Sequence, residues 1–171
     1  MKKISSVLIL ILLIFKTSLA STYSSDPQTF VQELVNDSIS KLSDKDLNKE
    51  EKADFIRNVA LENVDIDALG LYTLGELRKS ADKNDIVKYQ EVFKEYFLKS
   101  LTSRLTDYSS NKFEVIETEK KSSNYTIVKS RIAKNENQPE IKIDWRIYTK
   151  NPEKPLIRDL IVEGLSLART Q

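Results

Sequence analysis

The end of the chain contains two stretches whose residue pattern strongly restricts the structure they can form. Between residues 141 and 148, apolar side chains occupy every second position: Ile141, Ile143, Trp145 and Ile147. A period of two places these side chains on one face of a half-buried β-strand. The stretch 156–167 is also rich in apolar and β-branched residues, and the turn sequence Asn151–Pro155 separates the two. The pattern therefore predicts a hairpin with one buried face.

The first 20 residues have the order of charges and apolar residues that is typical of a secretory signal peptide. Lys2 and Lys3 precede an apolar run over 7–15, and the small residues Ser18 and Ala20 follow it. This order is that of a cleavable export signal. The apolar run is too short to span a bilayer. We predict cleavage after residue 20, which leaves a single exported domain over 21–171.

The composition of this exported domain excludes several classes of function. The chain has no cysteine and no histidine. Disulfides, thiolate metal sites, a lipidated N-terminal cysteine, imidazole-based triads and histidine-ligated zinc are therefore excluded. Loss of residues 1–20 removes three lysines and no acidic residue, which changes the net charge from +1 to −2. A near-neutral chain lacks the basic footprint of a nucleic-acid-binding protein. We expect no nucleic acid partner, no metal and no cofactor.

The first half of the mature sequence has the periodicity of helices. Asp26 followed by Pro27 is typical of a helix start, and apolar residues then recur at helical spacing as far as Leu42. Asn48 and Glu51 have the spacing of a capping box at the start of a second helix. A short helix is expected over 68–75, where two glycines permit close backbone approach or a break.

The longest helical pattern begins at Asp82. Its apolar and aromatic side chains recur at steps of three and four: Ile86, Tyr89, Phe93, Tyr96, Phe97, Leu101, Leu105 and Tyr108. After it, four short β-rich stretches are separated by polar turns: 113–118, 125–132, 141–148 and 156–167. A run of helices followed by a run of strands predicts an α+β fold, with N-terminal helices packed on a C-terminal four-stranded antiparallel meander sheet.

Short motifs in both halves resemble those of the MlaC family. In the sheet they are Asp144-Trp145-Arg146, the stretch 158–167 and the closing pair Thr170-Gln171. In the helices they are, in order, Asp65, Leu74-Gly75, Arg78, Ser80-Ala81, Gln90, Phe93 and Phe97. The MlaC family, also called the toluene-tolerance auxiliary family, contains the periplasmic phospholipid-binding proteins of the Mla ABC transport system. Its members continue past the Ser-Leu-x-x-Thr-Gln phrase into a further helix, whereas this sequence ends at Gln171. We therefore expect either a chain truncated at its C-terminus or a pocket that lacks one wall.

The resemblance implies a function in lipid transport and no enzymatic activity. It implies a soluble periplasmic carrier that holds phospholipid acyl chains in an apolar pocket between the helices and the sheet. The implied partners are an outer-membrane lipoprotein and porin complex and an inner-membrane ABC transporter complex with its substrate-binding ring. The carrier would move lipid between these two complexes.

The physics of such a cargo indicates which residues to consider for the pocket wall. A diacyl phospholipid has about 30 methylene groups, each worth about 0.8 kcal/mol against water, so the container must be nearly as apolar as a bilayer. The candidate lipid-binding residues are Phe93, Phe97, Leu101, Ile127, Ile143, Trp145, Ile147, Ile161 and Leu165. For any one of these positions, an apolar stripe more often means a closed, packed core, and only the family resemblance favours a pocket wall for the set. Arg146 and Arg104 are candidates for contact with a head group at the rim, although Arg146 alternates away from Trp145 and also suits a solvated outer face.

Two other functions remain open at this stage. Asp65 with Asp67, Asp144, and Asp159 with Glu163 are acidic residues that a carboxylate-dependent periplasmic hydrolase would need. Helix caps and strand-surface charges account for the same residues without catalysis. The other alternative is a structural or adaptor protein whose core is closed and holds no lipid.

Overall fold

The structure is a computed structural model that describes residues 23–106, 112–134, 136 and 139–168. Within these residues, helices precede strands in the order α1 (Pro27–Ser43), α2 (Lys49–Asn63), α3 (Ile66–Thr73), the 3₁₀ helix η1 (Gly75–Lys79), α4 (Lys83–Leu105), β1 (Phe113–Ser122), β2 (Tyr125–Ile132), β3 (Ile141–Tyr148), β4 (Leu156–Val162) and β5 (Leu165–Ser166). The predicted α+β class is confirmed. The predicted signal peptide over 1–20 lies outside the described residues.

The helices begin at the residues whose side chains can satisfy free backbone amides. The Asp26 carboxylate accepts a hydrogen bond from the Thr29 amide at 2.9 Å, and α1 starts at Pro27 as predicted. Asn48 and Glu51 form the predicted capping box of α2, since each side chain accepts a hydrogen bond from the other residue's amide. None of the described helices combines the length and the hydropathy that crossing a membrane requires.

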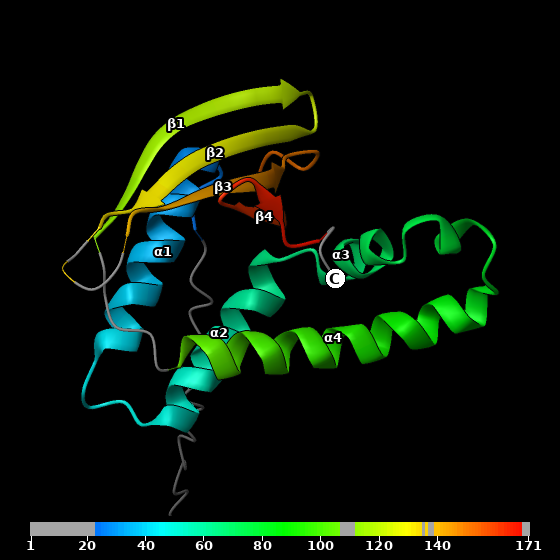
Figure 1. Ribbon diagram of the computed structural model, residues 1–171, viewed down its shortest axis with the longest axis horizontal. Coiled ribbons are helices and arrows are strands. Elements are labelled where there is room, and N and C mark those ends of the chain that lie inside the picture. The colour runs from blue at the N-terminus through cyan, green and yellow to red at the C-terminus, as the bar shows by residue number, and fades with distance from the viewer. Residues whose placement is uncertain (1–22, 107–111, 135, 137–138, 169–171) are drawn as a thin grey trace, which may run out of the picture.

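The strands form one antiparallel sheet in the order β1-β2-β3-β4-β5, which is a simple meander. Figure 1 shows this curved sheet as one layer, with α1 and α2 below it and the long α4 crossing α2. In the register, Trp145 of β3 lies opposite Val128 of β2 and Leu160 of β4. These three side chains therefore share one face of the sheet.

The sequence predicted one long last strand over 156–167 and therefore a sheet of four strands. That number of strands was wrong. The stretch turns at Glu163 and Gly164, whose φ angles are 49° and 81°. Positive φ at both central residues is the geometry of the two-residue hairpin turn that matches the twist of paired strands. Residues 156–167 therefore form the hairpin β4-β5, and the described sheet has five strands.

Buried apolar side chains gather in two clusters of the described residues. One lies between α1 and the sheet and includes Phe30, Val31, Val128 and Ile147. The other joins α2, α3 and α4 around Phe93 and Leu98. The molecule thus has a sheet layer with its own helix and a separate layer of three helices.

Gly70 of α3 sets how closely α3 and α4 approach. A β-carbon at this position would lie 2.9 Å from a ring carbon of Phe93, which is closer than real contacts allow. The absence of a side chain at Gly70 therefore lets the α4 aromatic ring rest on the α3 backbone. This is the close approach that the glycine was expected to permit.

A narrow seam joins the layer of three helices to the sheet. Val64, at the end of α2, forms a parallel β-bridge with Ile157 of β4. The next amide, that of Asp65, donates to the Ile157 carbonyl at 2.9 Å. The helical layer is therefore hydrogen-bonded to the sheet at the start of β4.

Candidate functional site

An apolar cavity of about 270 Å³ lies between the Trp145 face of the sheet and the helices α1, α2 and α4. Its described lining is almost entirely apolar, and the polar members are Ser38, Arg158 and Asp159. The apolar members are Leu34, Val35, Ile39, Leu42, Ile56, Val59, Ala60, Val64, Leu69, Phe97, Leu101, Leu105, Phe113, Ile132, Ile143, Trp145, Ile157, Leu160 and Leu167. A concave space of this composition favours apolar ligands.

The structure brings four of the candidate lipid-binding residues together on this cavity. Phe97 and Leu101 line it from α4, and Ile143 and Trp145 line it from β3. The apolar face predicted for β3 and the apolar face predicted for α4 thus both border this cavity. Phe97 is half-buried and stacks on Phe93, with the ring centroids 6.1 Å apart.

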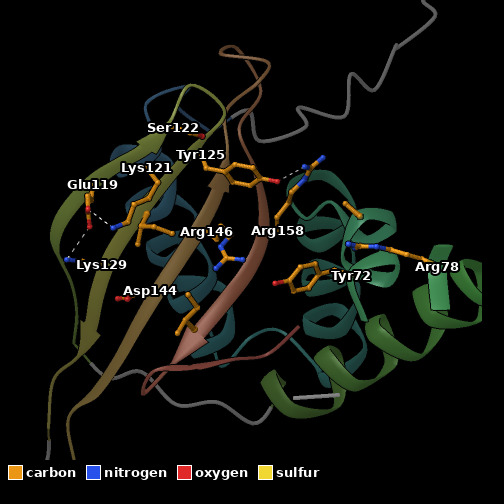
Figure 2. Close-up of a pocket in the computed structure, with 13 residues that line it drawn as sticks. Tyr72, Arg78, Glu119, Lys121, Ser122, Tyr125, Lys129, Asp144, Arg146 and Arg158 are labelled. Carbon is orange, nitrogen blue, oxygen red and sulfur yellow. Dashed lines mark hydrogen bonds and ion pairs between the residues drawn. The ribbon is translucent and has the colours of Figure 1, made fainter. Parts of the chain in front are cut away.

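The other five candidates lie elsewhere. Ile147 is buried in the cluster under α1, and Phe93 is buried between α3 and α4. Ile127 and Ile161 line a groove on the opposite face of the sheet (Figure 2). The register explains this, because Ile127 precedes the inward Val128 and Ile161 lies opposite the outward Asp144. Leu165, in β5, is 63 % exposed.

The two arginines considered for the rim lie away from the cavity. Arg146 points into the groove on the opposite face, in agreement with the alternation that places it away from Trp145. Arg104 is exposed near the end of α4. The charged side chains that line the cavity among the described residues are instead Arg158 and Asp159 of β4.

Sequence reasoning missed the contribution of α1 and α2 to the wall. Leu34, Val35, Ile39 and Leu42 of α1 line the cavity, as does Val59 of α2. The signal was present in the apolar stripes that predicted these helices. A stripe shows which face of a helix is buried, but it does not show whether that face meets a neighbour or a void.

Trp145 turns its one polar atom away from the cavity. Its Nε1–H donates to the Ser130 hydroxyl at 2.8 Å, and that hydroxyl donates to the Ile143 carbonyl at 2.8 Å. Ser130 is 1 % exposed, so this chain of hydrogen bonds lies inside the sheet layer. The indole thereby presents its apolar ring to the cavity.

Arg158 is fixed at the edge of the cavity by three side chains. Its Nε donates to Asp65 Oδ2 at 2.7 Å, and its NH1 group donates to the Tyr125 hydroxyl at 2.8 Å. Its guanidinium carbon lies 3.3 Å from the centre of the Tyr148 ring. Burial lowers the pKa of Arg158, but the hydrogen bonds with Tyr125 and Asp65 outweigh it and raise the pKa overall. The charged guanidinium of Arg158 therefore links Asp65, at the end of the helical layer, to Tyr125 of the sheet.

Two of the acidic residues considered for catalysis, Asp65 and Asp159, have structural partners. Asp65 caps α3 through the Ala68 amide and pairs with Arg158. Asp159 is 3 % exposed and accepts hydrogen bonds from the Ser166 hydroxyl at 2.6 Å and from the Ala168 amide at 3.1 Å. These contacts account for both carboxylates as parts of the fold.

Comparison with known proteins identifies the family. The sequence model described as MlaC protein matches residues 28–171. The chain belongs to the MlaC family. One solved structure similar to it is that of a phospholipid-binding protein from Ralstonia solanacearum in complex with a phospholipid. The two are 18 % identical, the match covers 84 % of this chain and 81 % of the other, and the TM-score is 0.66. No curated protein matches the sequence significantly.

The hydrogen bond that orients the indole in this MlaC-family chain can be tested by one substitution. Ser130→Ala leaves the buried Trp145 N–H without an acceptor, and we expect it to lower the free energy of unfolding by about 1–3 kcal/mol in urea denaturation. Ser103→Ala, at an exposed position of α4, is the control and should unfold with the wild type. Equal midpoints for the two variants would show that the Trp145 N–H does not depend on Ser130.

Proposed function

We propose that this protein is a periplasmic phospholipid carrier, not an enzyme, and that the apolar cavity beside Trp145 receives the acyl chains. The cavity itself is the observation that carries the proposal, because its lining offers methylene groups an environment close to that of a bilayer. Membership of the MlaC family and the phospholipid in the complex of the Ralstonia solanacearum protein support it. The exchange of lipid between outer-membrane and inner-membrane complexes is proposed on family membership alone.

The size of the cavity sets how much of the lipid it can hold. A cavity of about 150 Å³ accommodates a benzene ring, which corresponds to roughly 25 Å³ per carbon. At that density the 270 Å³ cavity holds roughly eleven carbons. Their burial is worth roughly 9 kcal/mol before the costs of association. This is enough for part of one acyl chain and too little space for both chains of a phospholipid.

We therefore infer that loading widens the cavity by moving α4 relative to the sheet. α4 packs chiefly on α2 and α3, so we expect the three helices to move as one layer. The layer is tied to the sheet at Val64 and Asp65, which lie at the edge of the cavity. Rotation about this seam would separate Phe97 and Leu101 from Ile143 and Trp145 while the fully buried members of each apolar cluster stay together.

A charge on the α4 wall tests the proposed site. We expect Phe97→Asp to abolish retention of phospholipid, because an ionised carboxylate in this cavity costs several kcal/mol. The measurement is native mass spectrometry of protein purified from cells, with circular dichroism as the check on folding. Tyr96→Asp places the same charge on the 60 % exposed neighbour in α4 and should retain lipid.

Three results of this experiment would contradict the proposal. Equal lipid retention by the two variants would remove Phe97 from the lipid-binding wall. Wild-type protein that carries no lipid would favour the adaptor with a closed core. Release of free fatty acid from added phospholipid, lost in a carboxylate variant such as Asp144→Asn, would favour the hydrolase.

Distances between spin labels test the widening. The chain has no cysteine, so pairs of labels can be placed directly at exposed positions. We expect the distance between Lys99→Cys on α4 and Lys142→Cys on β3 to increase when delipidated protein is loaded with phospholipid. The pair Lys120→Cys and Lys142→Cys, both in the sheet, should keep its distance. An unchanged α4-to-β3 distance in loaded protein would refute the motion.

A further inference from the structure

A second cavity lies on the face of the sheet opposite the apolar cavity. This groove has a volume of about 770 Å³ and is bounded by the outward residues of β1 to β4 on one side and by α3 and η1 on the other (Figure 2). Among the described lining residues, only Arg158 also lines the apolar cavity. The groove is thus a separate site. Most of its lining side chains are polar or charged, whereas those of the apolar cavity are almost all apolar.

The groove is lined by more positive than negative side chains. Among its described residues, the basic ones are Arg78, Lys121, Lys129, Arg146 and Arg158, and the acidic ones are Glu119 and Asp144. Three of the basic groups have acceptors close by. Lys121 pairs with Glu119, Lys129 with Glu117 at 3.0 Å, and Arg158 with Asp65 at 2.7 Å. The other two are the arginines Arg78 and Arg146.

Arg146 is a half-buried cation of the groove, and no acceptor among the described residues lies within hydrogen-bond distance of its guanidinium. Its side chain is 30 % exposed, and its closest ionic partner among the described residues is Asp159, at 3.7 Å. That separation is too long for a hydrogen bond. Both Asp159 oxygens already accept hydrogen bonds, from Ser166 and Ala168. A guanidinium carries five N–H donors, and leaving them unpaired in a partly desolvated site is costly.

Arg78 faces the same space from the helical side. It lies in η1 and is exposed, and it forms no ion pair with another residue in the described part of the chain. Figure 2 shows Arg78 and Tyr72 directed from η1 and α3 toward the sheet, where Arg146 points outward from β3. Two guanidinium groups from separate elements thus converge across the groove.

We propose that this groove binds a phosphate ester, with Arg146 and Arg78 as the residues that hold the phosphate. Arginine forks match phosphate oxygens in a bidentate manner, and a tetrahedral phosphate can accept from donors that arrive from different directions. The apolar side chains of Ile127 and Ile161 and the ring of Tyr125 also line the groove and suit the carbon part of an ester. The volume falls within the range of about 300–1,000 Å³ that small-molecule sites occupy.

Calorimetric titration of the mature protein with glycerol 3-phosphate tests the proposal. We expect saturable binding that weakens about tenfold or more in Arg146→Gln and also in Arg78→Gln. Arg104→Gln removes the same charge from the exposed end of α4 and should bind like the wild type. Arg78 is exposed, so its variant gives a valid result even if Arg146→Gln does not fold. Lipid retention in native mass spectra should be unchanged in all three variants, which separates this site from the apolar cavity.

A second titration distinguishes the sources of the phosphate. Binding of glycerol 3-phosphate supports a free ester as the ligand. Binding to phosphatidylglycerol vesicles alone, with the same dependence on Arg146 and Arg78, supports a lipid head group at a membrane surface. No saturable binding to either probe would overturn the proposal, as would equal weakening in Arg104→Gln. Binding of a hexaglutamate peptide without binding of either phosphate probe would also overturn it, in favour of an acidic protein segment.

Discussion

The antiparallel register around Trp145 is the constraint on which both cavities depend. Trp145 lies opposite Val128 and Leu160, and these pairs turn one face of the sheet toward the helices. The residues between them, including Arg146, then face the polar groove. Because side chains alternate along a strand, a slip of one residue would exchange the two sets. The Trp145–Ser130 hydrogen bond at 2.8 Å favours the correct register, since Ser130 must lie on the same face.

Arg158, beside the seam, lies between the apolar cavity and the polar groove, and these two spaces favour different ligands. On one side, the apolar cavity gains affinity from each methylene that leaves water. On the other, the groove attracts anions through charge and hydrogen bonds, which act over a longer range and weaken with salt. Arg158 reaches both, and its bonds to Asp65 and Tyr125 keep the guanidinium on the polar side. Movement of the helical layer at this seam would change both spaces, because α3 and η1 bound the groove and α4 bounds the apolar cavity.

Local sequence patterns predicted the helices and strands well, but they predicted the pairing of strands and the packing of layers less well. The alternation in β3 and the caps at Asp26 and Asn48 are local, and they correctly placed the strand and the helix starts. Glu163 and Gly164 also form a local turn, but the apolar residues on both sides hid it. The positions of Ile127 and Ile161 depend on pairing between strands, which one strand's alternation does not contain. The void beside Phe97 depends on how far apart two layers stand, a quantity that no residue pattern encodes.

Trp145 is the single tryptophan of the chain and lines the apolar cavity, so its fluorescence reports on that space alone. The most direct measurement is the quenching of this fluorescence by phospholipids that carry bromine atoms along their acyl chains. The account predicts strong quenching as the brominated lipid binds and none with unbrominated lipid. Lipid that binds, as shown by native mass spectrometry, while the brominated form leaves the Trp145 emission unchanged would contradict the account, because the tails would then lie elsewhere.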